Sequence, residues 1–97
     1  MNTTYEWDES KRQTNITKHG VDFTSALKFA WTDALIEVDN RHEYNEVRWV
    51  AFGPIGSRLH VMVYCERAGT IRLISLRKAN QREFDYYVSK INTAKPF

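Results

Sequence analysis

Hydrophobic and polar positions follow different periods along the chain, and the first segment has the pattern of an exposed helix. Residues 5–8 form an extended lead-in, Asp8 suits a helix N-cap, and Gly20 is a good C-terminal stop. Between these caps only Ile16 is strongly apolar. A helix with so narrow an apolar stripe buries little surface, so we predict that it lies largely in solvent.

A second helix is predicted to begin near Asp22 or Thr24 and to end at residues 31–33. Its apolar residues recur at the i, i+3, i+4 and i+7 spacing of one helix face, and they are Phe23, Ala26, Leu27 and Ala30. This spacing predicts one continuous apolar stripe along the helix.

The middle of the chain has the pattern of four strands. Leu35–Val38 is a short apolar run, and a polar, charged connection follows it. The remaining strands are rich in β-branched residues, and turn-forming residues separate them. We predict strands over 47–52, 58–66 and 70–77, with a turn over 53–57 and a hairpin through 67–69.

The last element is predicted to be a helix capped by Asn80, with Glu83 three residues later, as in a capping box. Its apolar positions predict a buried stripe of Phe84, Tyr87, Val88 and Ile91. The element order α-α-β-β-β-β-α predicts an α+β fold with an antiparallel sheet packed by helices. We expect one domain over 1–97, with flexible ends at 1–4 and 93–97.

Composition restricts the class of protein. The 97 residues are 42% apolar and 27% charged, as in a folded globular domain. The longest apolar run, 61–65, is far too short to span a bilayer, and the first twenty residues lack the apolar segment of a signal peptide. The single cysteine, Cys65, suits a reducing compartment. We therefore expect a soluble, cytoplasmic protein with no membrane partner.

Charge is segregated along the chain, although the formal net charge is only +2. Residues 33–46 carry five acidic side chains and one arginine, whereas residues 58–83 carry six basic and two acidic side chains. Such asymmetry favours an anionic partner for the basic segment. The alternative is that both segments are ordinary solvated faces.

Metal and nucleophilic chemistry find little support in the residue pattern. His19, His42 and His60 lie far apart with no paired cysteines. Glu46 occupies the position where a zinc-protease motif beginning at His42 needs its second histidine. The four glycines form no phosphate-binding loop, and Cys65 lies in an apolar strand typical of an inert thiol. We therefore expect no metal and no cofactor.

The charged residues of the predicted hairpin match the needs of metal-free RNA cleavage. That reaction needs a base for the 2′-hydroxyl proton, cations for the charged phosphorane and an acid for the 5′-oxygen. Glu66 is the candidate base, Arg67 and Arg72 the candidate cations, and Lys78 a further cation or proton source. His42, in an irregular charged segment, is a further candidate for proton transfer. The alternative is a surface salt bridge at Glu66, which contributes little.

The register of this hairpin decides which of these groups meet, and the residues leave it open. If 67–70 form the loop, Glu66 faces Ile71, and Arg72 lies beside Cys65 on the opposite sheet face. A loop that differs by one residue in length places Glu66 and Arg72 on the same face.

An ordered set of short motifs runs from Tyr5 to about Tyr87. The motifs are Glu6-Trp7-Asp8, Lys18-His19-Gly20-Val21 with Phe23, Ala26-Leu27, Arg41-His42 with Glu46 and Arg48, the Gly53 and Gly56 turn, Val63-Tyr64-x-Glu66-Arg67, Ile71-Arg72-x-Ile74-Ser75-x-Arg77-Lys78-Ala79 and Arg82-Glu83. Together they resemble the BrnT family of bacterial type II toxins, within the RelE-like ribonuclease superfamily. Asn45 and Val47 depart from the family pattern, which favours a glycine and a charged residue at these positions.

The resemblance implies a RelE-like fold and a metal-independent endoribonuclease that cuts mRNA and arrests growth. It also implies a BrnA-type antitoxin, which neutralises the toxin in a hetero-oligomer and carries the DNA-binding domain through which the complex represses its own operon. The activity residues of the family carry over best to Glu66, Arg67, Arg72, Ser75 and Lys78, and we expect Arg48, Arg58, Arg77 and Arg82 to bind RNA. The alternative is an inactive toxin, or a non-catalytic module that binds nucleic acid or protein through the same hairpin.

Overall fold

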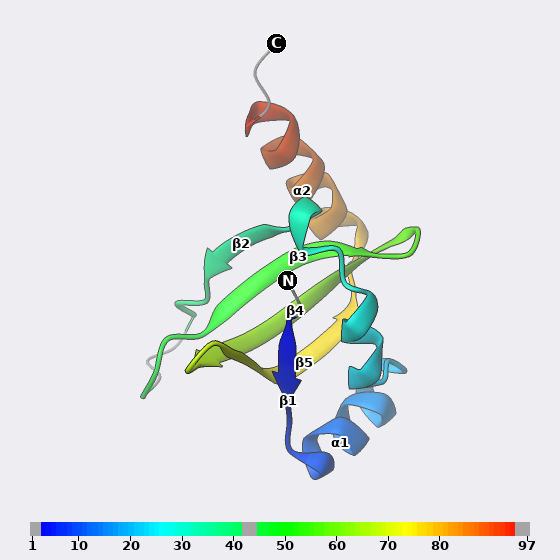
Figure 1. Ribbon diagram of the computed structural model, residues 1–97. Helices are drawn as coiled ribbons and strands as arrows, with labels where there is room; N and C mark the ends of the chain where they lie inside the picture. The colour runs from blue at the N-terminus through cyan, green and yellow to red at the C-terminus, as the bar shows by residue number, and fades with distance from the viewer. Residues whose placement is uncertain (1–2, 42–44, 95–97) are drawn as a thin grey trace.

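The computed structural model describes residues 3–41 and 45–94, which form five strands, two α-helices and two 3-10 helices (Figure 1). With η marking a 3-10 helix, the elements in chain order are β1 (Thr4–Glu6), α1 (Glu9–His19), η1 (Phe23–Lys28), η2 (Trp31–Asp33), β2 (Leu35–Val38), β3 (Trp49–Ile55), β4 (Arg58–Arg67), β5 (Thr70–Lys78) and α2 (Gln81–Ala94). All five strands join one sheet, so the predicted α+β class is confirmed.

The sheet has the strand order β1-β5-β4-β3-β2 and is mixed rather than purely antiparallel. The four predicted strands pair antiparallel as expected, but β1 adds a fifth strand parallel to β5. Thr4, expected in a flexible end, pairs with Thr70 across this edge. Three residues are too few to show alternation in the sequence, and β1 forms because the edge of β5 offers backbone groups to pair with.

The β4–β5 hairpin agrees with the predicted strands to within one residue at each end. Its turn consists of Ala68 and Gly69, both at positive φ, 51° and 82°. Two residues of this kind suit the right-handed twist of the paired strands. The turn therefore holds the register in which Glu66 pairs with Ile71 and Arg72 with Cys65, the first of the two alternatives.

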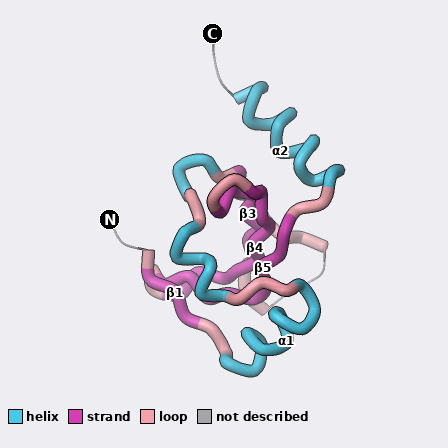
Figure 2. Tube along the Cα trace, turned by 90° about the vertical axis from the view of Figure 1, so that its right-hand side faces the viewer, coloured by secondary structure: helices cyan, strands magenta, loops and turns pink. Residues whose placement is uncertain are grey.

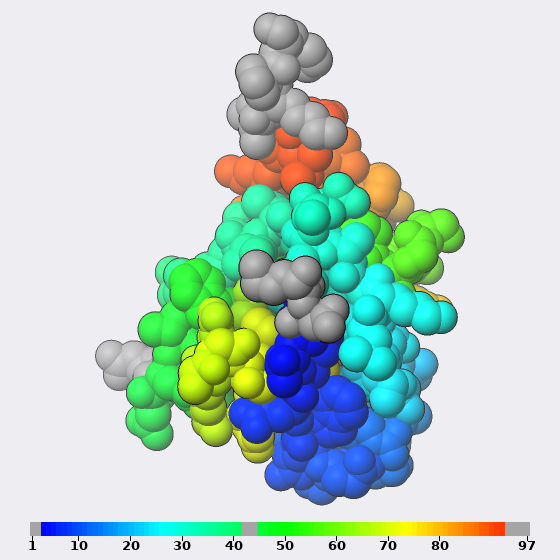
Figure 3. All heavy atoms as spheres, viewed as in Figure 1, coloured from blue at the N-terminus to red at the C-terminus, as the bar shows by residue number. Residues whose placement is uncertain are grey.

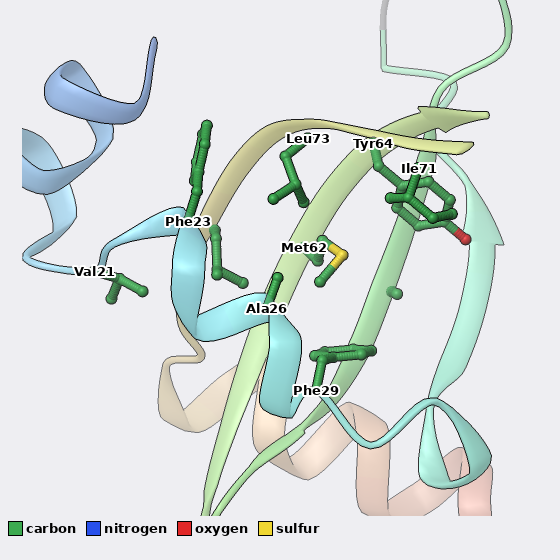
Figure 4. Packing of buried hydrophobic residues seen from close by; sticks show 10 residues of the cluster. Val21, Phe23, Ala26, Phe29, Met62, Tyr64, Ile71 and Leu73 are labelled. Atoms are coloured by element: carbon green, nitrogen blue, oxygen red, sulfur yellow. The ribbon is translucent and has the colours of Figure 1, made fainter. Parts of the chain in front are cut away.

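One face of the sheet is covered by η1 and η2, which replace the predicted α-helix (Figure 2). A 3-10 helix has three residues per turn, so Phe23, Ala26 and Phe29 recur on one side. These residues pack against Met62 at the centre of the sheet (Figure 4). Leu27, predicted to share the apolar stripe, is instead 71% exposed because the helical period is three and not 3.6.

Both predicted caps of α1 are confirmed. Asp8 accepts two backbone N–H groups of the first turn, and Gly20 ends the helix at φ 70°. The one buried side chain of this helix is Asn15, whose Nδ2 donates to the carbonyls of Leu76 (2.7 Å) and Val21 (2.8 Å). Its Oδ1 accepts from the Leu76 N–H at 3.1 Å. Asn15 therefore satisfies the backbone N–H and C=O groups of Leu76 at the edge of β5, beyond the end of β1.

The predicted turn over 53–57 is too long, because β3 continues to Ile55 and the turn is confined to 56–57. Gly53 lies inside the strand, where the Phe29 ring packs onto its backbone. A Cβ at this position would lie 2.5 Å from Cζ of Phe29. Gly53 is therefore needed for the close approach of an aromatic ring to the strand, and not for a turn.

The capping box of α2 is confirmed, but its buried stripe is not. Glu83 N–H donates to Asn80 Oδ1 at 2.8 Å, and Asn80 N–H donates to Glu83 Oε1 at 2.9 Å. Phe84 is 46% and Val88 36% exposed, whereas Tyr87 and Ile91 are half-buried. The helix leaves one end of the sheet and projects beyond it, so little of its length meets a packing partner (Figures 1 and 3). No helix among the described residues is long and apolar enough to cross a membrane.

Candidate active site

The sheet face opposite η1, here called the open face, carries most of the arginines of the basic segment. Side chains alternate between the two faces of a strand, and Met62 and Tyr64 of β4 point toward η1. Their neighbours along β4 therefore point the other way. Cross-strand pairing extends this face to residues of all five strands, among them Glu6, Leu35, Glu37, Val50, Phe52, Leu59, Val61, Val63, Cys65, Arg67, Arg72, Ser75 and Arg77.

The open face combines a buried apolar floor with a row of guanidinium groups. Val61 and Cys65 are only 2% and 3% exposed. Arg77 pairs with Val61 and Arg72 with Cys65 across the β4–β5 ladder, and Arg67 follows at the end of β4. At about 3.3 Å per residue, the row from Val61 to Arg67 spans roughly 20 Å. A row of this length can contact several consecutive phosphates of a single strand.

Arg67 and Arg72 each lie beside a carboxylate at one end of this row. Arg67 donates from Nε (3.2 Å) and from Nη2 to Glu46, which lies just before β3. These hydrogen bonds lower the pKa of Glu46, so the carboxylate is ionised at neutral pH. Arg72 approaches Glu6 of β1 at 3.8 Å, too far for a hydrogen bond. Both pairs are partly exposed, so a bound phosphate can compete for the two guanidinium groups.

The other end of the row is held more tightly. Arg77 donates from Nη1 and Nη2 to the two carboxylate oxygens of Glu83 on α2, at 2.8 Å each. This pair lowers the pKa of Glu83. Asp39, 5% exposed, accepts from Nε and Nη2 of Arg41 at 2.8 and 2.9 Å. The two ion pairs border a pocket of about 290 Å³ over the apolar floor beside Val50.

Carboxylates and arginines supply the reactive groups of this face. Among residues 3–41 and 45–94, no three His, Cys, Asp or Glu side chains are grouped to hold a metal ion. Burial raises the pKa of the Cys65 thiol, so it is protonated at neutral pH and is a poor nucleophile. The arrangement suits an anionic substrate whose reacting group gains negative charge.

Comparison with known proteins assigns the chain to a family. A family model described as ribonuclease toxin, BrnT, of type II toxin-antitoxin system matches residues 7–83. The chain belongs to the BrnT family. The match includes strands β2 to β5 and thus all three arginines of the open face. Membership makes this chain a ribonuclease toxin of a type II system, whose partner is a protein antitoxin.

A solved BrnT structure has a similar fold. The crystal structure of the Brucella abortus ribonuclease toxin BrnT matches with a TM-score of 0.59 and 28% sequence identity. The match covers 82% of this chain and 100% of that chain. No curated protein matches the sequence. The BrnT resemblance stated from the sequence motifs is therefore confirmed.

The structure brings together four of the predicted cations at the open face. Arg67, Arg72 and Arg77 point from the strands, as described above. Arg48, half-buried just before β3, contributes positive potential at Asp39 and Glu46. In this BrnT chain these four predicted cations therefore lie on one surface.

Three other predicted site residues are divided between the two sheet faces. Glu66 is exposed and pairs with Ile71, so it lies on the opposite sheet face from Arg72. Lys78, exposed at the end of β5, pairs with His60 on that same opposite face. Ser75 pairs with Val63 of the open face next to the β-bulge, and it lines a groove beside α1. Glu66 and Lys78 therefore lie on the opposite face from Arg72, whereas Ser75 lies on the same face as Arg72.

The remaining candidates lie at the end of the sheet near α2 or outside the residues that the structure describes. Arg58, exposed at the start of β4, donates from Nη2 to the Ala79 carbonyl at 3.2 Å. Arg82 is exposed in the first turn of α2. His42, the proton-transfer candidate, lies outside the described residues.

Sequence reasoning missed the carboxylates of the open face. Glu6 lies on β1 and Glu46 just before β3, on either side of the β4–β5 hairpin, and only the folded sheet places each beside an arginine. Glu37 had a detectable signal, because alternation in β2 places it on the same face as Leu35. No sequence signal indicated its partner Tyr86, because the hydrogen bond between Tyr86 and Glu37 depends on the direction in which α2 projects.

Proposed function

We propose that this BrnT-family chain is a metal-independent endoribonuclease that cuts mRNA and thereby inhibits translation and growth. The observation that supports this proposal is the row of Arg67, Arg72 and Arg77 over an apolar floor, with the ionised carboxylate of Glu46 at one end. Cations placed in this way favour the charge that develops on phosphorus during cleavage.

In the proposed reaction, the 2′-oxygen of the RNA attacks the adjacent phosphorus and the bond to the 5′-oxygen breaks. The products are a 2′,3′-cyclic phosphate and a free 5′-hydroxyl. Arg67 and Arg72 stabilise the extra negative charge of the phosphorane. Glu46 accepts the 2′-hydroxyl proton, and water supplies a proton to the departing 5′-oxygen. The low pKa of Glu46 keeps it in the unprotonated form that this role requires.

The proposed general base is Glu46 and not Glu66. Glu66 was the sequence candidate because it adjoins Arg67, but its side chain lies on the opposite face from Arg72. Glu46 reaches the open face from the segment before β3 and hydrogen-bonds Arg67 directly. A base must lie within hydrogen-bond reach of the group that it deprotonates while the cations contact the same phosphate.

We expect the purified protein to cleave single-stranded RNA at an undiminished rate in excess EDTA, because the proposed chemistry needs only arginine and carboxylate side chains. The measurement is cleavage of a labelled RNA with and without chelator, with product ends identified by mass. Loss of activity in EDTA and its return with a divalent ion contradicts the metal-free mechanism. RNA that is bound but never cut identifies a binding module or an inactive toxin instead.

The partner is proposed to be a BrnA-type antitoxin with a DNA-binding domain, through which the complex represses its operon. An acidic segment of such a partner fits the basic residues 58–83, and buried apolar contacts supply most of the affinity. Because the family is inhibited by a protein antitoxin, covering the open face is a direct means of inhibition.

We expect charge reversal at Arg67 to slow association with this antitoxin by about threefold to tenfold at low salt, because long-range attraction steers the encounter. Arg67 is preferable to Arg77, since Arg77 also anchors α2 through Glu83. The measurement is the association rate of wild type, Arg67→Glu and Lys28→Glu over a salt series. An association rate that changes neither with salt nor in Arg67→Glu shows that the antitoxin docks elsewhere.

A further inference from the structure

The pocket of about 290 Å³ on the open face differs from the surface around Arg67 and Arg72 in the residues that line it. Its floor is apolar and comes from two neighbouring strands, with Val50 and Phe52 from β3 and Val61 and Val63 from β4. Three of these four side chains are buried, so the floor is firmly packed. A flat apolar floor suits a planar ring and not a phosphate, which needs donors on every side.

The walls of this pocket carry hydrogen-bonding groups of both kinds. Arg77 on one side is fixed by its two hydrogen bonds to Glu83. Glu37 of β2 lines the other side, and its Oε2 accepts a hydrogen bond from the Tyr86 hydroxyl. The Tyr86 ring also meets Phe52 edge-on, with centroids 5.7 Å apart. The first turns of α2 thus fix a donor and an acceptor around one apolar floor.

This combination matches a guanine base more closely than the other bases. Guanine presents two adjacent donors, N1–H and the N2 amino group, which a carboxylate accepts together. It also presents O6 and N7, for which the two-pronged guanidinium of arginine is the commonest partner. Adenine, cytosine and uracil lack this pair of adjacent donors. In single-stranded RNA these edges are free to be read by side chains.

From this geometry, and resting on the proposed ribonuclease function, we propose that the pocket binds a guanine base of the RNA next to the scissile phosphate. Glu37 accepts from N1–H and the N2 amino group, Arg77 donates to O6 and N7, and Phe52 lies under the ring. Arg77 pairs with Val61 and Arg72 with Cys65, four residues or roughly 13 Å along β4. A nucleotide bound in the pocket therefore has its neighbouring phosphates within reach of Arg72.

The test is to digest a pool of random single-stranded RNA and to sequence the new 5′ ends. We expect guanine to be enriched at one fixed position beside the cut for wild type. Glu37→Gln replaces one acceptor oxygen by a donor, so it should lower that enrichment about tenfold or more while cuts at other positions persist. Glu9→Gln, an exposed glutamate of α1 far from the pocket, is the matched control and should keep the wild-type profile. A cleavage profile without guanine enrichment in wild type, or one that Glu37→Gln leaves intact, overturns the proposal.

A second measurement separates this proposal from the proposed function. Guanosine and adenosine monophosphates are titrated into the protein in the absence of RNA, and binding is followed by NMR shifts of pocket residues. Selective binding of guanosine monophosphate that is weakened about tenfold in Glu37→Gln supports the pocket even if no RNA is cleaved. Equal binding of both nucleotides, or none, overturns it even if RNA is cleaved. The same spectra show whether each variant is folded.

Discussion

Replacing Arg72 by alanine is expected to lower the rate of RNA cleavage by about 10²–10³-fold. Loss of one positioned group that stabilises transition-state charge has an effect of this size. Arg72 lies at the centre of the proposed site, beside Cys65 on the open face, and no hydrogen bond ties it to Glu6 at 3.8 Å. Its guanidinium is therefore ready to turn to the phosphate.

The same substitution should change the free energy of unfolding by less than about 1 kcal/mol, because a partly exposed ion pair contributes little to stability. The measurements are single-turnover cleavage of a labelled RNA and urea unfolding of each variant. Arg72→Lys keeps the charge but not the fork of donors and should recover part of the rate. Lys28→Ala, which removes an exposed cation from η1, is the control. Cleavage by Arg72→Ala at the wild-type rate would show that the active site does not lie on the open face.

Replacing Gly53 by alanine is expected to destabilise the fold by about 3 kcal/mol, at the upper end of overpacking effects. The added Cβ would lie 2.5 Å from Cζ and 3.0 Å from Cε1 and Cε2 of Phe29. That ring cannot easily move, because Phe29 is 6% exposed and meets Trp31 edge-on at 4.8 Å. The backbone of Phe29 is also bridged to Ile55 of β3. The melting temperature should fall by roughly 12–24 °C for a domain of this size.

A double-mutant cycle identifies the clash as the cause. Phe29→Leu removes the part of the ring that the new methyl group meets, so it should relieve the clash in the Gly53→Ala background. The stability of the two single variants and of the double variant is measured by urea unfolding. Strictly additive effects would show that the cost at Gly53 comes from the strand backbone and not from the aromatic ring.

The sequence by itself determined the elements whose signals are local. Asp8, Gly20 and the Asn80–Glu83 capping box mark helix ends because a cap satisfies backbone groups within a few residues. Ala68 and Gly69 define the tight turn of the central hairpin for the same reason. The charge pattern also identified the basic segment, and the ordered motifs identified the family.

Only the tertiary structure decided which charged groups meet. The pairing of Arg72 with Cys65 follows from the two-residue turn, and a shift of one residue would have exchanged the two faces. Glu6 and Glu46 join the arginines through β1 and the segment before β3, which are distant in sequence. Likewise, Leu27 is exposed because η1 adopts a three-residue period to fit Phe23, Ala26 and Phe29 against the sheet. Such contacts depend on long-range packing, which local patterns of polar and apolar residues do not encode.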